Sequence, residues 1–136
     1  MASDPLVEEY LLLGLALGRH VAGMVDAYYG PPELARRAEA EAASSPAALV
    51  QRARRLLADL DPAAGAPVPS EPSPRTGSSV PDGLRRRWLA AQVSGLHTTA
   101  RKLAGEPVGY LDEVEACYGV RPEAVPEEDL SAAHAR

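Results

Sequence analysis

The sequence lacks most of the residues that support cross-links or recognisable chemistry. Cys117 is its single cysteine, which excludes an internal disulfide and a zinc site built from cysteines. Phenylalanine is absent, aromatic residues make up 4% of the chain, and Trp88 is the one tryptophan. No two histidines have the four-residue spacing of a helical zinc site, and there is no glycine-rich phosphate loop or nucleophile elbow. The chain therefore contains no motif that could catalyse a reaction unaided.

The net charge and the hydropathy of the chain also argue against nucleic-acid and membrane partners. The net charge of −5 is opposite to the basic surface that nucleic-acid binding needs, so we expect no nucleic-acid partner. The apolar run 11–18 is shorter than the roughly 20 residues that cross a bilayer. Asp4, Glu8 and Glu9 stand where a signal peptide would be positively charged, so we expect a cytoplasmic protein without a membrane partner.

What the chain does contain favours helices. Apolar residues reach 46%, and the strong helix formers alanine, leucine, arginine and glutamate are abundant. We predict an all-α fold, an irregular array or bundle of about five to six helices with one long proline-rich linker. A helical segment 1–60, the linker 61–81 and a second helical segment 82–136 that packs on the first would form one domain, which we expect to be incomplete.

The linker 61–81 holds six prolines, two glycines and four serines, with almost no large apolar group. Burial cannot offset the entropy of ordering such a segment, so we expect it to be flexible. We interpret it as a tolerated surface insertion rather than as a functional lid.

Apolar residues recur three and four positions apart along 6–29, which predicts a long first helix. They spread around the helix, so it needs neighbours on two sides, and we expect more apolar surface on it than the other segments can cover. Gly30 is expected in the left-handed conformation that closes a helix, with Pro31 at the start of the next. Tyr118-Gly119 is a looser copy of this Tyr-Gly corner. The remaining helices are predicted at about 32–43, 46–60, 83–104, 108–118 and from Pro126 onward. Ser44-Ser45 is expected to cap the helix that begins at Pro46, and Gly105 with Pro107 is expected to end the helix 83–104.

The packing of these helices can also be predicted. We expect the first helix to pack against the fourth, with Trp88 among the buried contacts. Replacing a buried tryptophan by alanine would cost about 3–5 kcal/mol. In the fifth helix we expect Leu111, Val114 and Cys117 to be buried, with Cys117 acting as a small apolar side chain.

The polar residues give no assignable catalytic or metal site. Arg85–Arg87 stand near a helix start, where cations oppose the helix dipole, so they need anions such as Glu8, Glu9 or the cluster 127–129. We interpret these arginines as a solvated or salt-bridged face rather than as a nucleic-acid contact. Isolated histidines are more often packed or solvated than ligands, so we assign no catalytic residue, metal ligand or cofactor within the chain.

Three segments carry a family resemblance: EEYLLLGLALGRHVAGMVDAYYGPPEL, RRRWLAAQVSGLHTTARKLAGE and YLDEVEACYGVRPEAVPEEDLSAAHA. They resemble the N-terminal part of a bacterial family of helical proteins of unknown function. Those proteins are in turn similar to H-E-x-x-H zinc metallopeptidases of the carboxypeptidase Taq kind. The block Asp26–Pro32 is the most specific part of the resemblance.

The resemblance implies an all-α fold and, in the full-length form, a zinc-dependent hydrolase. Its H-E-x-x-H helix would lie downstream of Arg136, so zinc is implied only if that motif exists, and no catalytic residue or metal ligand is carried over to this chain. By the same analogy Asp26, Tyr28 and Tyr29 would shape a cleft. His20 is a further candidate for its lining.

Three functions fit the sequence. The first is the N-terminal segment of a zinc-metallopeptidase-like protein, catalytically incomplete, whose partner is the missing C-terminal region. The alternative is a freestanding helical module for protein interaction or dimerisation, whose homodimer partner binds surplus apolar surface on the first helix. The third is a small ligand-binding bundle with His20 and Asp26 in its pocket.

Overall fold

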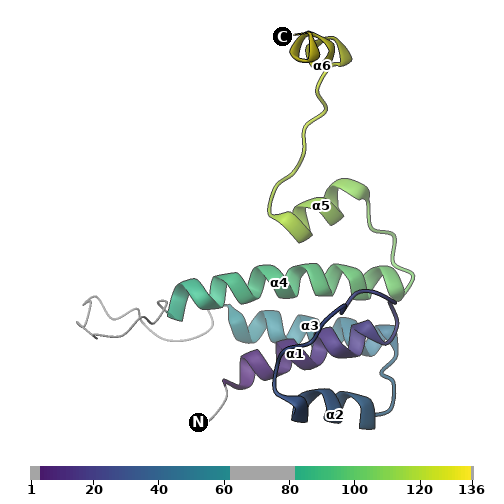
Figure 1. The fold of residues 1–136 in the computed structure, drawn as a ribbon, viewed down its shortest axis with the longest axis vertical. Helices are drawn as coiled ribbons and strands as arrows, with labels where there is room; N and C mark the ends of the chain where they lie inside the picture. Colours follow the sequence, from purple (N-terminus) through teal and green to yellow (C-terminus); the bar gives the residue numbers. More distant parts are fainter. Residues whose placement is uncertain (1–3, 62–81, 136) are drawn as a thin grey trace, which may run out of the picture.

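The computed structural model describes residues 4–61 and 82–135. This part of the chain contains six helices and no strand, so the predicted all-α class is confirmed (Figure 1). The helices are α1 (Pro5–Gly18), α2 (Pro32–Ala40), α3 (Pro46–Leu60), α4 (Asp82–Leu103), α5 (Tyr110–Tyr118) and α6 (Glu127–His134). Of the predicted linker 61–81, all but Asp61 lies outside the described residues. No described helix has the length and apolar character that crossing a membrane requires.

α1 begins as its sequence predicts but ends much earlier. The Asp4 carboxylate caps the helix by accepting a hydrogen bond from the Leu6 amide at 3.0 Å, and a proline occupies the first turn. The helix ends at Gly18, so the prediction of a helix over 6–29 is wrong beyond that residue. Apolar spacing continues past Gly18, but Gly23 has a φ of 78°, which lies outside the helical region.

Residues 19–31 form an irregular connection because their side chains find partners in distant segments. Arg19 Nη1 donates to the carbonyl oxygens of Ala38 and Glu41, at 3.1 and 2.7 Å, and so satisfies acceptors at the end of α2. His20 contacts the segment before α3 in the same way. These contacts join residues far apart in the sequence, so helical periodicity alone does not reveal them.

Two of the three glycines that are predicted to end a helix have a positive φ. Gly119 closes α5 in the left-handed conformation with a φ of 70°, and Gly105 follows α4 with a φ of 82°. Gly30 does not have a positive φ, so its predicted left-handed conformation is wrong. A Cβ atom at this position would meet the Tyr28 hydroxyl, so a larger residue would have to displace the end of the Tyr28 side chain.

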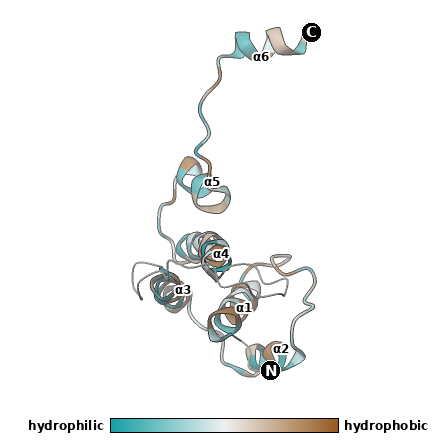
Figure 2. Cartoon of the chain, turned by 90° about the vertical axis from the view of Figure 1, so that its left-hand side faces the viewer, coloured by the Kyte–Doolittle hydropathy of each residue, from teal (hydrophilic) through white to brown (hydrophobic). Residues whose placement is uncertain are grey.

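The core forms where α1, α3 and α4 meet. Seen nearly end-on in Figure 2, these helices lie at the corners of a triangle, and α2 lies beyond α1. Leu13 and Leu17 of α1 are fully buried in this core. The main core consists of Leu13, Leu17, Leu49, Val50, Ala53, Leu56, Leu60, Leu89, Val93 and Ala100. On the other side of α1, Leu12 packs with Leu34 and Ala38 of α2.

The predicted two-sided covering of α1 is therefore confirmed. Every leucine of α1 is buried or half-buried. α2 packs on the face that α3 and α4 leave open and covers Leu12. Leu6, Leu11 and Leu15 stay half-buried, so some of the apolar surface expected to remain on this helix is still open. The exposed large apolar side chains lie mainly on α4, α5 and the segment that follows α5.

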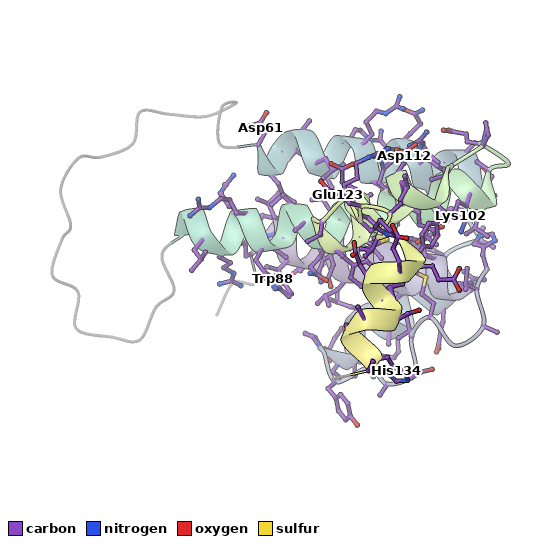
Figure 3. All side chains as sticks on the ribbon, turned by 90° about the horizontal axis from the view of Figure 1, so that it is seen from above. Asp61, Trp88, Lys102, Asp112, Glu123 and His134 are labelled. Atoms are coloured by element: carbon purple, nitrogen blue, oxygen red, sulfur yellow. The ribbon has the colours of Figure 1, made fainter. Side chains whose placement is uncertain are left out.

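Trp88 is not buried, although α1 packs against α4 as predicted. Its side chain is 55% exposed and meets the Tyr10 ring edge-on, with 6.2 Å between ring centroids. The neighbouring Leu89 takes the core position instead, and Val93 and Ala100 repeat at helical spacing behind it. Trp88 lies on the first half of α4, at the border of the buried stripe (Figure 3).

The other helices follow their predicted boundaries to within a few residues. α3 begins with the predicted cap, since the Ser45 hydroxyl accepts a hydrogen bond from the Ala48 amide at 3.2 Å. α2 ends at Ala40 rather than residue 43, and α5 begins at Tyr110 rather than residue 108. The bounds of α4 and α6 agree to within one residue of those predicted.

We call residues 119–135 the C-terminal arm; it extends beyond α5 and ends in α6 (Figure 1). α5 lies on α4, where the Lys102 ammonium and the Glu113 carboxylate pair at 2.6 Å. Leu111 and Cys117 are exposed and Val114 is half-buried, so the predicted burial of the first two is wrong. α6 contains no buried residue and lies away from the other helices in Figures 1 and 2.

The burial of Leu13 and the exposure of Trp88 predict that truncating Leu13 destabilises the protein more than truncating Trp88 does. Leu13→Ala should lower the free energy of unfolding by about 2–5 kcal/mol, because the side chain is fully buried in the main core. Trp88→Ala should cost only about 1–2 kcal/mol, because it removes one aromatic contact at an exposed border. Urea denaturation of both variants measures the difference. A larger loss for Trp88→Ala than for Leu13→Ala would contradict this core.

Candidate functional site

A pocket of about 240 Å³ lies between α1, the connection 19–31 and α4. None of its lining residues carries a formal charge. The lining consists of Tyr10, Leu11, Gly14, Leu15, Met24, Val25, Ala27, Tyr28 and Leu96. The α1 residues of this set are spaced by one, three and four positions, so they share one face of the helix. The early end of α1 lets the connection fold back and form the opposite wall.

Gly14 leaves open space in the wall that α1 gives to the pocket. A Cβ atom built on Gly14 would have no atom within 4 Å, outside its own chain neighbours and helix backbone. Any larger side chain at this position would extend into space that is now free. A glycine inside an apolar helical pattern was the sequence signal that could have indicated this hollow.

Tyr28 forms the wall nearest the end of the connection. Its hydroxyl donates a hydrogen bond to the Pro31 carbonyl at 3.1 Å, which holds the ring over Gly30. Loss of hydration, together with the nearby Glu33 carboxylate, raises the pKa of Tyr28 above its ordinary value. The side chain is therefore a neutral hydrogen-bonding group at physiological pH.

Only one of the four predicted site residues lines this pocket. Tyr28 does so, whereas His20, Asp26 and Tyr29 are exposed and are not part of the lining. His20 Nε2 lies 2.8 Å from the Ser44 carbonyl oxygen, and the Tyr29 side chain is 95% exposed. Because α1 ends at Gly18, His20 and Asp26 do not lie on the predicted helix.

The arginines at the start of α4 have different partners from those expected. Glu9 pairs with Arg52 of α3, and one of the two contacts, from Nη2 to Oε2, measures 3.1 Å. Arg86 Nη1 donates to the Asp59 carbonyl oxygen at 3.1 Å. The acidic cluster 127–129 belongs to α6, far along the chain and away from α4 in Figure 1.

A second hollow of about 200 Å³ lies at the same end of α4. It is lined by Asp4, Leu6, Arg85, Arg86 and Leu89. Leu84 and Trp88 are exposed beside it. We call residues 84–89, with this hollow, the basic α4 patch; it combines exposed cations with exposed apolar side chains.

The described residues bring no three histidine, cysteine, aspartate or glutamate side chains together in a way that could hold a metal ion. His97 of α4 differs from the other histidines because its Nε2 atom is buried without a hydrogen-bond partner. Burial, with Arg101 and Arg54 nearby, lowers the pKa of His97 below its ordinary value near 6.5.

Comparisons with protein-family models, with curated proteins and with solved structures found no match to this chain.

The lowered pKa of His97 predicts a pH dependence of stability. The unfolded chain takes up the proton first as the pH falls below about 6.5, so stability decreases from there down to the folded-state pKa. Urea denaturation between pH 7.5 and pH 5, values chosen around the ordinary histidine pKa of about 6.5, should show a smaller decrease for His97→Asn. His134→Asn is the control, since His134 is exposed in α6. Equal pH dependence of wild type and His97→Asn would contradict the prediction.

Proposed function

We propose that this chain is a helical interaction module that associates with a second copy of itself. The C-terminal arm of one copy would bind the basic α4 patch of the other. The proposal rests mainly on one observation. The arm contains large apolar side chains, and none of its residues is buried within its own copy. The homodimer partner expected on α1 is thus assigned to a different surface.

The chemistry of the arm supports this assignment. Val120, Val125 and Leu130 are exposed large apolar side chains along it. An eight-residue helix such as α6 is marginal in water, because few backbone hydrogen bonds offset the ordering of its residues. Packing of Leu130 against a partner would stabilise α6, and burying one such side chain contributes about 1.5–3 kcal/mol.

Charge makes the two surfaces complementary. The first turn of α6 carries Glu127, Glu128 and Asp129, whereas the basic α4 patch carries Arg85–Arg87, all exposed. Exposed ion pairs contribute only about 0.2–1 kcal/mol each, so they select the partner and its register more than they supply affinity. The apolar contacts, with Trp88 as the largest side chain of the patch, would supply most of the affinity.

A second copy is a better acceptor for the arm than its own α4. The arm is held to α5 at its start, where Arg121 pairs with Asp112 at 2.9 Å and Glu115 at 2.7 Å. Beyond these pairs the arm leaves α5, and α6 lies well away from α4 (Figure 1). Reciprocal binding of two arms to two patches would give a closed twofold dimer, the commonest symmetry of soluble oligomers.

Charge reversal tests this dimer. Changing Glu127, Glu128 and Asp129 to lysine should weaken self-association at least tenfold, as should changing Arg85, Arg86 and Arg87 to glutamate. A mixture of the two variants should form the heterodimer, because the reversed charges are again complementary. Sedimentation equilibrium at low salt measures all three cases.

Arg36→Glu with Arg37→Glu is the matched control, because it reverses exposed cations of α2 and should leave self-association unchanged. A wild-type chain that stays monomeric at every concentration would contradict the proposal. Dimerisation that survives both triple variants would contradict the assignment of the arm and the patch.

A second proposal keeps the resemblance to zinc metallopeptidases. In this proposal the chain is the N-terminal segment of a longer bacterial, cytoplasmic protein, and the rest of that polypeptide covers the arm. It is supported by the block Asp26–Pro32, the most specific part of the resemblance, which contributes Ala27 and Tyr28 to the pocket lining. The proposal requires an H-E-x-x-H motif encoded after the codon for Arg136, in frame or after a frameshift, and sequencing beyond that codon decides it.

A further inference from the structure

We infer that the pocket over Gly14 binds a small, uncharged, mostly apolar molecule of about the size of one substituted aromatic ring. The pocket lining includes no residue of the arm or of the basic α4 patch, so the inference does not rest on the proposed dimer, although Tyr10 of the lining contacts Trp88 of the patch. It also differs from the ligand site expected from the sequence, because His20 and Asp26 do not line it.

The residues that line the pocket disfavour a charged ligand. Its nine residues include leucine, valine, methionine, alanine and tyrosine side chains but no lysine, arginine, aspartate, glutamate or histidine. An ion entering this pocket would give up hydration without gaining an opposite charge, which is costly. An apolar ring gains from the same transfer, because it leaves water for contact with Leu11, Leu15 and Leu96.

The volume sets the size of the ligand. About 240 Å³ exceeds the 150 Å³ of an engineered apolar cavity that binds benzene. It is smaller than the pockets that hold drug-sized ligands, which begin at about 300 Å³. One ring with one or two small substituents therefore fits, and the open space over Gly14 adds room for the ring.

Tyr28 adds a preference for one polar group. Its hydroxyl hydrogen is already donated to the Pro31 carbonyl, so the oxygen can offer a ligand only its acceptor lone pairs. A ligand with a hydroxyl or N–H donor complements this oxygen, whereas a ligand with an ether in that position does not. The inferred class is therefore a phenol, a cyclic alcohol or an aromatic amine, each of which is neutral at physiological pH and carries one donor.

A set of matched probes tests this inference. Titration of the ¹⁵N-labelled full chain with p-cresol should shift the amide signals of Gly14, Tyr28 and Leu96 in a saturable way. At neutral pH, 4-hydroxybenzoate keeps the ring and hydroxyl but adds a negative charge, and it should bind at least tenfold more weakly. 4-Methylanisole keeps the shape but lacks the donor, and it should bind several-fold more weakly.

Substitutions in the walls of the pocket locate the site. Gly14→Leu should abolish p-cresol binding because its side chain fills the open space. Gly14→Ala is the control for helix propensity, and it should retain most of the binding. If Gly14→Leu does not fold, Ala27→Leu narrows the pocket from the exposed connection and should weaken binding at least tenfold.

Three outcomes would overturn the inference: no saturable shifts with p-cresol, equal binding of 4-hydroxybenzoate, or unchanged binding in both leucine variants. None of them bears on dimerisation. Sedimentation of Gly14→Leu should match that of the wild type, so failure of the pocket and failure of the dimer can be told apart.

Discussion

The burial of α1 on two sides is the constraint on which the rest of the structure depends. Leu13 and Leu17 need the core formed with α3 and α4, and Leu12 needs α2 on the opposite side. Covering both sides of one short helix forces the chain to return to it after Gly18, and the returning connection creates the pocket wall. The pocket is thus a by-product of the same apolar burial that holds the four helices together.

The residues that specify helices locally were predictable, and those that act across the fold were not. The Ser45 cap and the glycines at 105 and 119 follow from short-range rules, and the structure confirms them. The end of α1 depends on Arg19 reaching the end of α2, which periodicity does not encode. The exposure of Trp88 has the same origin, because its neighbour Leu89 fits the three-helix core and only one of them can face it.

The same distinction applies to the candidate site. Tyr28, which the family resemblance assigns to a cleft, lines the pocket, and its ring is held by the nearby Pro31 and Gly30. His20 and Asp26 are predicted to lie on the first helix and in one pocket, but α1 ends before them at Gly18 and neither residue lines the pocket. Gly14 interrupts an apolar helical pattern, but that signal alone does not show which side of the helix stays open, because this depends on how the connection 19–31 returns to α1. The basic α4 patch and the acidic start of α6 were both noted, but their separation within one copy is a property of the fold.

Trp88 has a consequence for observing the molecule. It is the only tryptophan in the sequence, and more than half of its side chain is open to solvent at the edge of the basic α4 patch. Its fluorescence emission therefore reports on this one surface, without contributions from other indole rings. A partner that covers the patch would remove water from around the indole ring and move its emission to shorter wavelength. Tryptophan fluorescence of the unlabelled chain can therefore detect binding at the basic α4 patch.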